Sequence, residues 1–379
     1  MSAPSAGPLH GMKVVEMAGL GPAPLAGQFL SDLGAQVTLI TRKSGPANPA
    51  DINNRGKRSV ALNLKSPDGL AAAQKLIDTA DVLIEGFRPG VMERMGLGPD
   101  TCLTRNPTLV YGRMTGWGQD GPMSQMAGHD INYLGITGVL NAIGKKDAPP
   151  VPPLNIAADY AGGTMFLLLG ILSALFERQT SGRGQVIDAA MVDGAPALLA
   201  LIHSMIAMGQ WSEHRESNWL DGGAPFYRSY ACKDGKYVSV GPLEPQFYAQ
   251  LIDIAGLPDD HKATQNDETS WLARHASYEQ LFATKTRDEW TALFDGTDAC
   301  VAPVLTWSEA PNHPHMQARG VFTQVDGVTQ VTPAPRFSRT APGPVGKPPA
   351  PGADTETVLA ELGYDADMIA GLRASGVLT

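Results

Sequence analysis

The sequence has little cysteine, and its three cysteines are far apart. Cys102, Cys232 and Cys300 form no CxxC pair and stand near no cluster of histidines. This spacing argues against a disulfide framework and against a zinc site, and it fits a reducing compartment. We therefore expect a cytoplasmic protein.

Long apolar runs and targeting signals are also missing. The most apolar stretch, Met165 to Phe176, is shorter than the roughly 20 residues that cross a bilayer, and it predicts a buried helix. The first residues lack the charged, apolar and small segments of a secretory leader. These features predict a chain with no membrane insertion.

Charge is sparse, at 18% of residues, and the net charge is −9. Such a field repels nucleic acid and anionic membranes, so an anionic ligand would need a local basic patch. The sequence contains no Gly-x-Ser-x-Gly elbow, no P-loop and no His-Glu-x-x-His motif, and its carboxylates are too scattered to indicate a metal site.

The first half of the chain predicts a parallel sheet with helices on its faces. Strands are predicted at 12–17, 36–41, 81–85, 108–115 and 185–189, and helices at 24–33, 66–79, 163–177 and 192–208. This alternation is typical of an α/β fold with a Rossmann-like sheet. The turn at 18–23 has two glycines of a dinucleotide fingerprint, but Arg42-Lys43 stands where a ribose-binding acid belongs, which argues against NAD.

A basic cluster begins at the end of the second predicted strand. Its members are Arg42, Lys43, Arg55, Lys57, Arg58 and Lys65. Cations at the carboxyl end of a sheet strand favour a phosphate-bearing ligand. A solvated basic loop is the alternative.

A smaller α+β unit is predicted to follow. Its predicted elements are a hairpin of 226–232 and 236–240, a helix at 244–255, helix starts at the capping boxes Ser277–Gln280 and Thr286–Glu289, and a strand at 301–305. Segments 209–223 and 307–330 lack periodicity and predict crossings between domains. The Pro-rich segment 342–351 predicts an extended linker, and 354–378 predicts two short helices.

Two turns deliver groups suited to proton transfer. His129 lies in Gly-His-Asp-Ile-Asn-Tyr at 128–133, and Asp159 follows Asn155 by one helical turn. A base and an acid from two separate turns can stand on opposite sides of one substrate carbon. Glu244, between two prolines at a strand exit, is a third candidate. The alternatives are a satisfied polar histidine and acids that only begin helices.

Several stretches together resemble the α-methylacyl-CoA racemases, a branch of the family III CoA-transferase superfamily. The motifs are Leu9–Glu16, Glu85–Val91, Met114–Gln119, Ala127–Tyr133, Pro153–Asn155 with Asp159 and Gly162-Gly163, Gly184–Ala189, Val301–Leu305 and Pro335–Phe337. Most of these motifs belong to the whole superfamily, whereas residues 128–133 resemble the racemase branch.

The resemblance implies an interlocked homodimer with its site between the large domain of one chain and the small domain of the other. The expected domains are a large CoA-binding domain over 1–208, a crossing linker over 209–223, a small domain over 224–306, a return linker over 307–332, and a tail over 333–379 that rejoins the large domain.

The resemblance also implies roles for individual residues. His129 and Asp159 would carry protons on the two faces, Asn155 would place Asp159, and Glu244 of the second chain would orient His129. Arg42, Lys65 and Arg94 would hold CoA phosphates, Leu62 and Leu64 would flank the adenine, and Gly128, Asp130 and Tyr133 would line the thioester path.

The implied reaction interconverts (R)- and (S)-2-methylacyl-CoA thioesters through an enolate, as part of lipid metabolism. It needs no metal and no cofactor beyond the coenzyme A of the substrate. The rival function is a family III CoA-transferase, in which Asp159 attacks the thioester. A third possibility is a CoA-binding protein without chemistry.

Overall fold

The computed structural model describes residues 7–379, which form two compact units. The large unit combines the chain up to Thr137 with Pro153–Leu198 and Gly320–Thr379, and the small unit combines Gly138–Pro152 with Leu199–Arg319. Residues 138–152 and 199–208, predicted for the large domain, group with the small unit.

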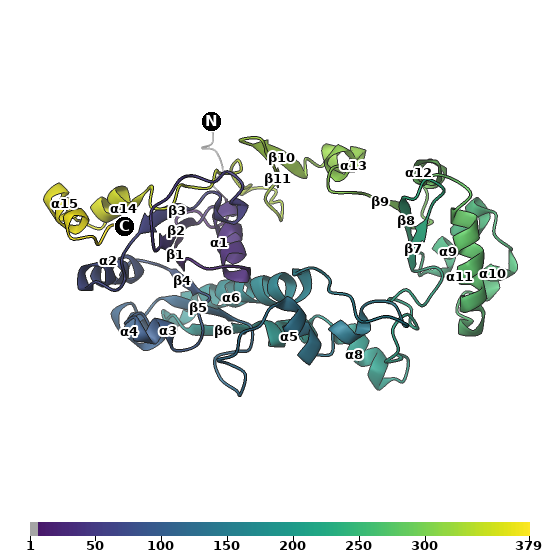
Figure 1. The fold of residues 1–379 in the computed structure, drawn as a ribbon, viewed down its shortest axis with the longest axis horizontal. Helices are drawn as coiled ribbons and strands as arrows, with labels where there is room; N and C mark the ends of the chain where they lie inside the picture. The colour runs from purple at the N-terminus through teal and green to yellow at the C-terminus, as the bar shows by residue number, and fades with distance from the viewer. Residues whose placement is uncertain (1–6) are drawn as a thin grey trace. The chain divides into compact units, whose positions relative to one another are not determined.

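The large unit is built on a six-stranded parallel sheet (Figure 1). Its strands are β1 (Lys13–Met17), β2 (Gln36–Thr41), β3 (Arg58–Ala61), β4 (Val82–Glu85), β5 (Val110–Thr115) and β6 (Val186–Ala190). The order β3-β2-β1-β4-β5-β6 confirms the predicted α/β fold with a Rossmann-like sheet. It reverses direction between β1 and β4, which is where open parallel sheets form ligand crevices at their carboxyl ends.

Strand β3 was not anticipated, because its short sequence begins with a cation in a basic stretch. It lies at the sheet edge, where unpaired backbone groups need cover. The C-terminal tail supplies that cover: Ser59 N–H donates to the Asp354 carboxylate (2.8 Å) and Ala61 N–H to the Thr355 hydroxyl (3.0 Å). The tail thus belongs to the large unit, with its two predicted helices present as α14 (Thr355–Glu361) and α15 (Ala366–Ala374).

Helices connect the strands of the large unit. They are α1 (Pro22–Asp32), η1 (Ile52–Asn54), α2 (Pro67–Asp78), α3 (Val91–Arg94), α4 (Pro99–Arg105), α5 (Asp130–Ile136), η3 (Ile156–Thr164), α6 (Met165–Ser181) and α7 (Met191–Ala197). As predicted, Ser66 caps α2 by accepting the Gly69 N–H. The predicted helix 192–208 is wrong as one piece: α7, which contains Pro196, ends at Ala197, and the chain resumes as α8 (Ala200–Ala207).

Helix α6 continues directly from the π-helix η3, giving one continuous helix of 26 residues from Ile156 to Ser181. By length and composition alone, this helix could cross a membrane, which the shorter apolar run did not predict. It packs instead on the sheet, because α6 contacts β5 and β6 and buries Leu167 and Ile171. In this fold one face of the helix is buried against the sheet, and 44% of its most apolar window is buried.

The small unit pairs an antiparallel sheet with helices around an aromatic core. The sheet contains β7 (Arg228–Ala231), β8 (Tyr237–Val240) and β9 (Val301–Val304). The other elements are η2 (Leu140–Ala142), α8, α9 (Pro245–Ala255), α10 (Asp260–Ala263), α11 (Glu268–Phe282), α12 (Arg287–Phe294), η4 (Ala310–Asn312) and α13 (Pro314–Ala318). Tyr230, Tyr278, Phe282 and Trp290 are fully buried. The predicted hairpin, the 301–305 strand and the smaller α+β unit are confirmed.

One prediction for this half of the chain is wrong. The Ser277 capping box lies inside α11, which already begins at Glu268 after the cap Asp267. The segment 307–330, whose crossing between domains stays a prediction, contains η4, α13 and most of the hairpin β10 (Phe322–Val325) and β11 (Val328–Val331). The capping box at Thr286 is confirmed as the start of α12.

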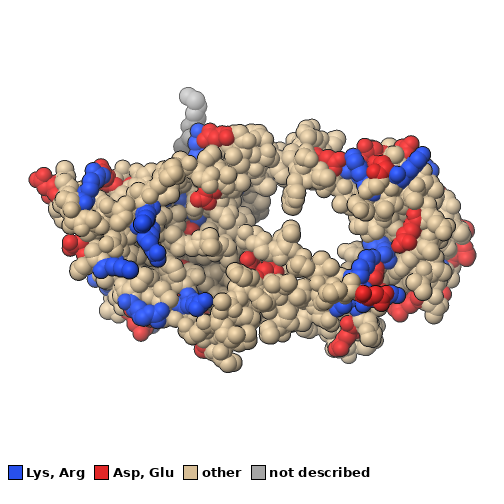
Figure 2. Space-filling view, in the orientation of Figure 1, with Lys and Arg blue, Asp and Glu red and all other residues tan. Residues whose placement is uncertain are grey.

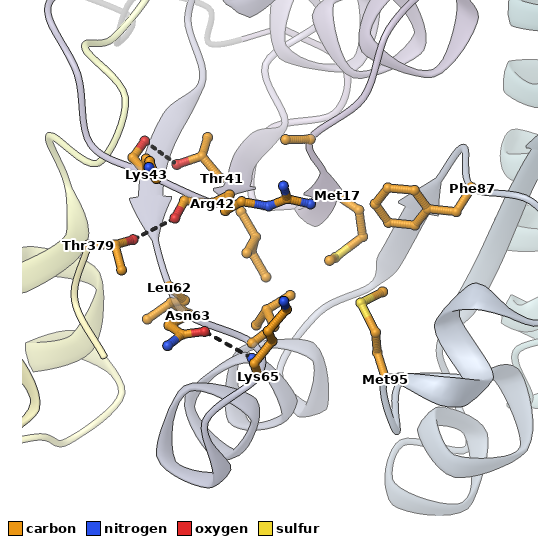
Figure 3. A pocket seen from close by; sticks show the side chains of 13 residues that line it. Met17, Thr41, Arg42, Lys43, Leu62, Asn63, Lys65, Phe87, Met95 and Thr379 are labelled. Carbon is orange, nitrogen blue, oxygen red and sulfur yellow. Dashed lines mark hydrogen bonds between the residues drawn. The ribbon is translucent and has the colours of Figure 1, made fainter. Parts of the chain in front are cut away.

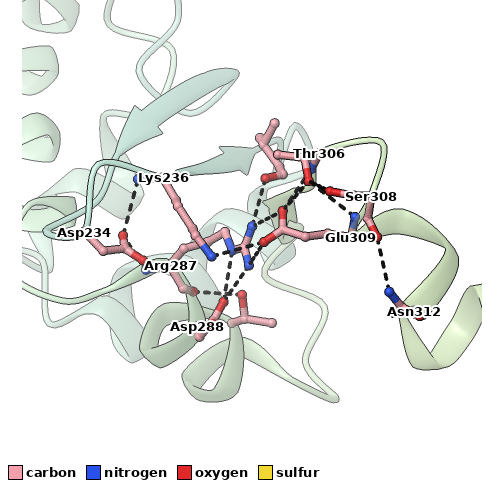
Figure 4. A network of polar contacts seen from close by, with 10 residues as sticks. Asp234, Lys236, Arg287, Asp288, Thr306, Ser308, Glu309 and Asn312 are labelled. Carbon is pink, nitrogen blue, oxygen red and sulfur yellow. Dashed lines mark hydrogen bonds and ion pairs between the residues drawn. The ribbon is translucent and has the colours of Figure 1, made fainter.

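Glu309 lies at the centre of a polar network in the small unit (Figure 4). Its carboxylate accepts hydrogen bonds from both terminal nitrogens of Arg287 (2.9 and 3.0 Å), from Lys236 Nζ (3.1 Å) and from the Thr306 N–H (2.9 Å). These contacts, led by Arg287, hold the pKa of Glu309 far below its ordinary value. The network fixes the chain where it leaves β9.

We expect Glu309→Gln to destabilise the small unit at neutral pH and to matter less in acid. Because the folded-state pKa is lowered, the contribution of Glu309 is present above its ordinary value of 4.5 and is lost as the pH falls below it. Urea unfolding followed by tryptophan fluorescence measures this, since five of the six tryptophans lie in the small unit. Asp288→Asn, at an exposed partner of Arg287, is the control; a difference from wild type that is constant between pH 7 and 3 would contradict the prediction.

Candidate active site

Two cavities lie along the carboxyl edge of the sheet in the large unit. The basic cavity, of about 510 Å³, is lined by Met17, Ala18, Ile40, Thr41, Arg42, Lys43, Leu62, Asn63, Leu64, Lys65, Phe87, Met95 and Thr379. The His129 cavity, of about 760 Å³, is lined by residues 20–23, 86–89, 114–117, 124, 126–129, 133, 159 and 191. Phe87, just after β4, lines both cavities, so they adjoin at the crossover of the sheet.

The basic cavity brings together four of the predicted CoA-binding residues. Figure 3 shows the side chains of Arg42, just after β2, and Lys65, just before α2, extending into it. Among residues 7–379, neither cation has a carboxylate within ion-pair distance. Leu62 and Leu64 add an apolar wall. A phosphate-bearing ligand with an apolar ring suits this lining.

Half of the predicted basic cluster is not available to a ligand. Three of its cations form ion pairs instead: Arg55 with Asp32 (2.6 Å), Lys57 with Glu16 (2.7 Å) and Arg58 with Glu361 (2.8 Å). Their acidic partners come from distant parts of the sequence, so the sequence cluster overstates the patch.

Arg94 lines neither cavity. It is exposed at the end of α3, next to Met95, which does line the basic cavity. Figure 2 shows Lys and Arg side chains gathered over the α2 and α3 region of the large unit. Arg94 therefore lies beside the basic cavity rather than in it.

His129 and Asp159 line the same cavity from separate turns, as predicted. His129 is the N-cap of α5, and its backbone N–H donates to Asn132 Oδ1 (3.0 Å). Asp159 lies in the first turn of η3, where Asn155 Nδ2 donates to its carboxylate (3.4 Å). Burial raises the pKa of Asp159, and Asp130 adds to that rise, while Asn155 and His129 oppose it. A half-buried carboxyl of this kind is suited to carry a proton.

The Asp130 side chain does not line the predicted thioester path. It is 4% exposed, and one oxygen accepts the N–H groups of Ala158 (2.8 Å) and Asp159 (2.9 Å). The prediction missed this because Asp130 meets η3 only in the folded chain.

Tyr133 and Gly128 form a wall of the cavity. The Tyr133 ring is 6% exposed and meets Trp117 edge-on, with centroids 4.7 Å apart. A Cβ at Gly116 would overlap this ring, and one at Gly128 would lie 2.7 Å from it. Burial raises the pKa of Tyr133 to about 12, with smaller contributions from Asp159 and Asp130, so the phenol keeps its proton. The glycine-rich turn at 116–118 was the one sequence signal for Trp117.

Glu244 lies in the small unit. It is the N-cap of α9, directly before Pro245. Its pairing with His129 stays a prediction. Within residues 7–379, no three His, Cys, Asp or Glu side chains cluster as metal ligands would.

Comparison with known proteins places these features in context. The model of CoA-transferase family III matches residues 9–355. The chain is 45% identical to alpha-methylacyl-CoA racemase of Mus musculus over 372 residues, covering 98% of this chain and 97% of the mouse protein. It is 42% identical to the Homo sapiens protein of the same name over 374 residues, with 98% and 97% covered. A CAIB/BAIF family protein from Brucella suis matches with a TM-score of 0.80 and 28% identity, over 94% of this chain and 99% of that one.

Proposed function

The chain belongs to CoA-transferase family III. Within this family, we propose that it is an isomerase, an α-methylacyl-CoA racemase. It interconverts (R)- and (S)-2-methylacyl-CoA thioesters by moving the α-proton. The observation that carries this proposal is the presence of His129 and Asp159 in one cavity, from two separate turns. Identity of 42–45% to two racemases supports it.

The reaction removes the α-proton on one face and returns a proton on the other. His129 serves one face and Asp159 the other, and one of them must start protonated. The raised pKa of Asp159, caused first by burial, favours its protonated form relative to an exposed carboxyl. The enolate oxygen needs a hydrogen-bond donor between them, and the backbone N–H of Asp130 at the start of α5 is our candidate, worth roughly 3 to 4 kcal/mol.

The two adjoining cavities suit the two ends of an acyl-CoA. In this proposal, Arg42 and Lys65 hold phosphates, assisted by Arg94 from outside the cavity, and Leu62 and Leu64 flank the adenine. The pantetheine arm passes Phe87 towards Gly128 and Tyr133, which places the thioester beside His129.

We also propose that the working form is an interlocked homodimer in which Glu244 of one chain orients His129 of the other. Helix α6 supports this, because it exposes large apolar side chains at helical spacing. These are Met165, Leu169, Leu172 and Phe176, which are 41–75% exposed. Apolar stripes of this size are typical of interfaces.

The proposal is tested with one enantiomer of a 2-methylacyl-CoA in deuterated water, without free acid. We expect α-deuterium incorporation together with drift towards an even mixture of enantiomers. A second incubation contains an added carboxylic acid. Absence of α-exchange in the first incubation, together with CoA transfer to the acid in the second, would instead establish the transferase, with Asp159 as the nucleophile. Binding of CoA with neither reaction would leave a CoA-binding protein.

A further inference from the structure

The buried carboxylate of Asp130 joins the two turns of the candidate site. Asp130 directly follows His129, and its Oδ2 atom accepts the backbone N–H groups of both Ala158 and Asp159, at 2.8 and 2.9 Å. Segments that are 28 and 29 residues apart in sequence thus meet at one oxygen atom. Both hydrogen bonds are shielded from water, since Asp130 is 4% and Ala158 0% exposed.

The start of η3 requires such an acceptor. The first N–H groups of a helix have no partner within the helix, and a π-helix leaves one more of them open than an α-helix does. A buried N–H without an acceptor is costly, and an anionic acceptor at a helix start is favoured by the helix dipole. Asp130 therefore fixes where the backbone of η3 begins.

From these contacts we infer that Asp130 is a positioning residue, whose side chain sets the place of the Asp159 backbone relative to His129. The inference rests on the proposed function for its catalytic consequence. Among residues 7–379, the hydrogen bond to the Asp159 side chain is the longer contact from Asn155, at 3.4 Å. On the other side, Asn132 holds the His129 backbone (3.0 Å). Asp130 is the link between these two local restraints.

The charge of Asp130 has a second effect on the same pair. The groups that face Asp159 are Asp130, Asn155 and His129, and of these only Asp130 raises its pKa, after burial. Asp130→Asn keeps an oxygen acceptor but removes the charge. Asp130→Ala removes both. The two variants therefore separate position from charge.

The experiment measures kcat and KM for α-deuterium exchange in both variants. We expect Asp130→Ala to lower kcat by about 10- to 100-fold with KM changed less than about threefold, because misplacement by about 1 Å costs this much. Asp130→Asn should retain more activity and should move the Asp159 limb of the pH–rate profile to lower pH. Asp365→Ala, which removes a carboxylate that caps α15 through Met368 N–H (2.8 Å), is the matched control and should leave kcat unchanged.

A second readout does not depend on the reaction. Amide hydrogen exchange in 156–164 should become faster in Asp130→Ala and stay unchanged in Asp365→Ala. Unchanged protection there, or a loss expressed in KM alone, would overturn the inference. A wild type without α-exchange would overturn the proposed function only, since the hydrogen-exchange result still decides the role of Asp130.

Discussion

Replacing His129 by Ala is expected to leave α-proton exchange on only one enantiomer of a 2-methylacyl-CoA. Each enantiomer presents its α-proton to one face of the site, so the enantiomer that faces Asp159 can still lose and regain its proton there. It should exchange without inversion. For the enantiomer that faces His129, exchange should fall by about 10²- to 10⁴-fold, the usual effect of losing a positioned base.

Asp159→Asn should show the complementary pattern. The amide keeps the size of the carboxyl and the contact with Asn155, but it accepts no proton. Racemisation, which needs both groups, should fall in both variants. The raised pKa of Asp159 also predicts a pH dependence. In His129→Ala, where Asp159 is the remaining base, the rate of exchange should rise with pH until the Asp159 carboxyl is ionised.

Each enantiomer is incubated separately in deuterated water, and deuterium content and enantiomer ratio are followed together. His203→Ala, at an exposed histidine of α8, is the control for loss of a histidine as such. Loss of exchange from both enantiomers in both variants would contradict two independent carriers. CoA transfer that survives in His129→Ala but not in Asp159→Asn would favour the transferase.

The alternation of strands and helices made most of the sheet predictable. Strands β1, β2 and β5 are short runs that contain several apolar or β-branched residues, as buried parallel strands do. Strand β3 was missed because Arg58 begins it, and a cation in a basic stretch indicated a loop. Its strand character depends on β2 beside it and on the tail that covers its edge, which local sequence does not contain.

The turns that carry His129 and Asp159 were predictable, but the shape of η3 was not. The sequence indicates a helix near Asp159, and a π-helix arises from tertiary contacts. Gly162 lies so close to α7 that a Cβ there would stand 2.7 Å from the Ala195 nitrogen, and a Cβ at Gly194 would overlap the Gly162 carbonyl. The glycine pair at 162–163 was therefore a packing signal, whose partner helix only the fold reveals.

The basic cluster shows the same limit in electrostatic terms. Arg42, Lys57 and Lys65 are all cations of one sequence cluster. The Lys57 side chain is fully buried against Glu16, whereas the other two line the basic cavity. What separates them is the acid that each one meets. That acid comes from β1 for Lys57, and it has no counterpart for Arg42 or Lys65 within residues 7–379.

Lys57→Met is expected to destabilise the large unit by about 3 to 5 kcal/mol, because it leaves the Glu16 carboxylate buried without a partner. Both side chains are 0% exposed, with Lys57 Nζ 2.7 Å from the carboxylate. Lys57 also donates to the Pro24 carbonyl (3.0 Å) and to Asn54 (3.1 Å), so it joins β1, α1 and η1. The Glu16 carboxylate is packed so closely against Gly27 that a Cβ there would overlap it, so the carboxylate cannot move in that direction once Lys57 is removed.

The loss should grow with pH. Burial already raises the pKa of Glu16 to about 7, against the attraction of Lys57, and removing the cation raises it further. A folded-state pKa above the unfolded value means that stability is present below the unfolded value of 4.5 and is lost as pH rises through the folded value. Urea unfolding followed by far-UV circular dichroism at pH 5 and 8 should therefore show the larger difference from wild type at pH 8.

Lys347→Met, which breaks the exposed pair with Asp326 (2.8 Å), should cost no more than about 1 kcal/mol at either pH. The double variant Glu16→Gln with Lys57→Met should recover most of the stability, and a loss that is the same at both pH values would show that packing, and not the stranded carboxylate, is responsible.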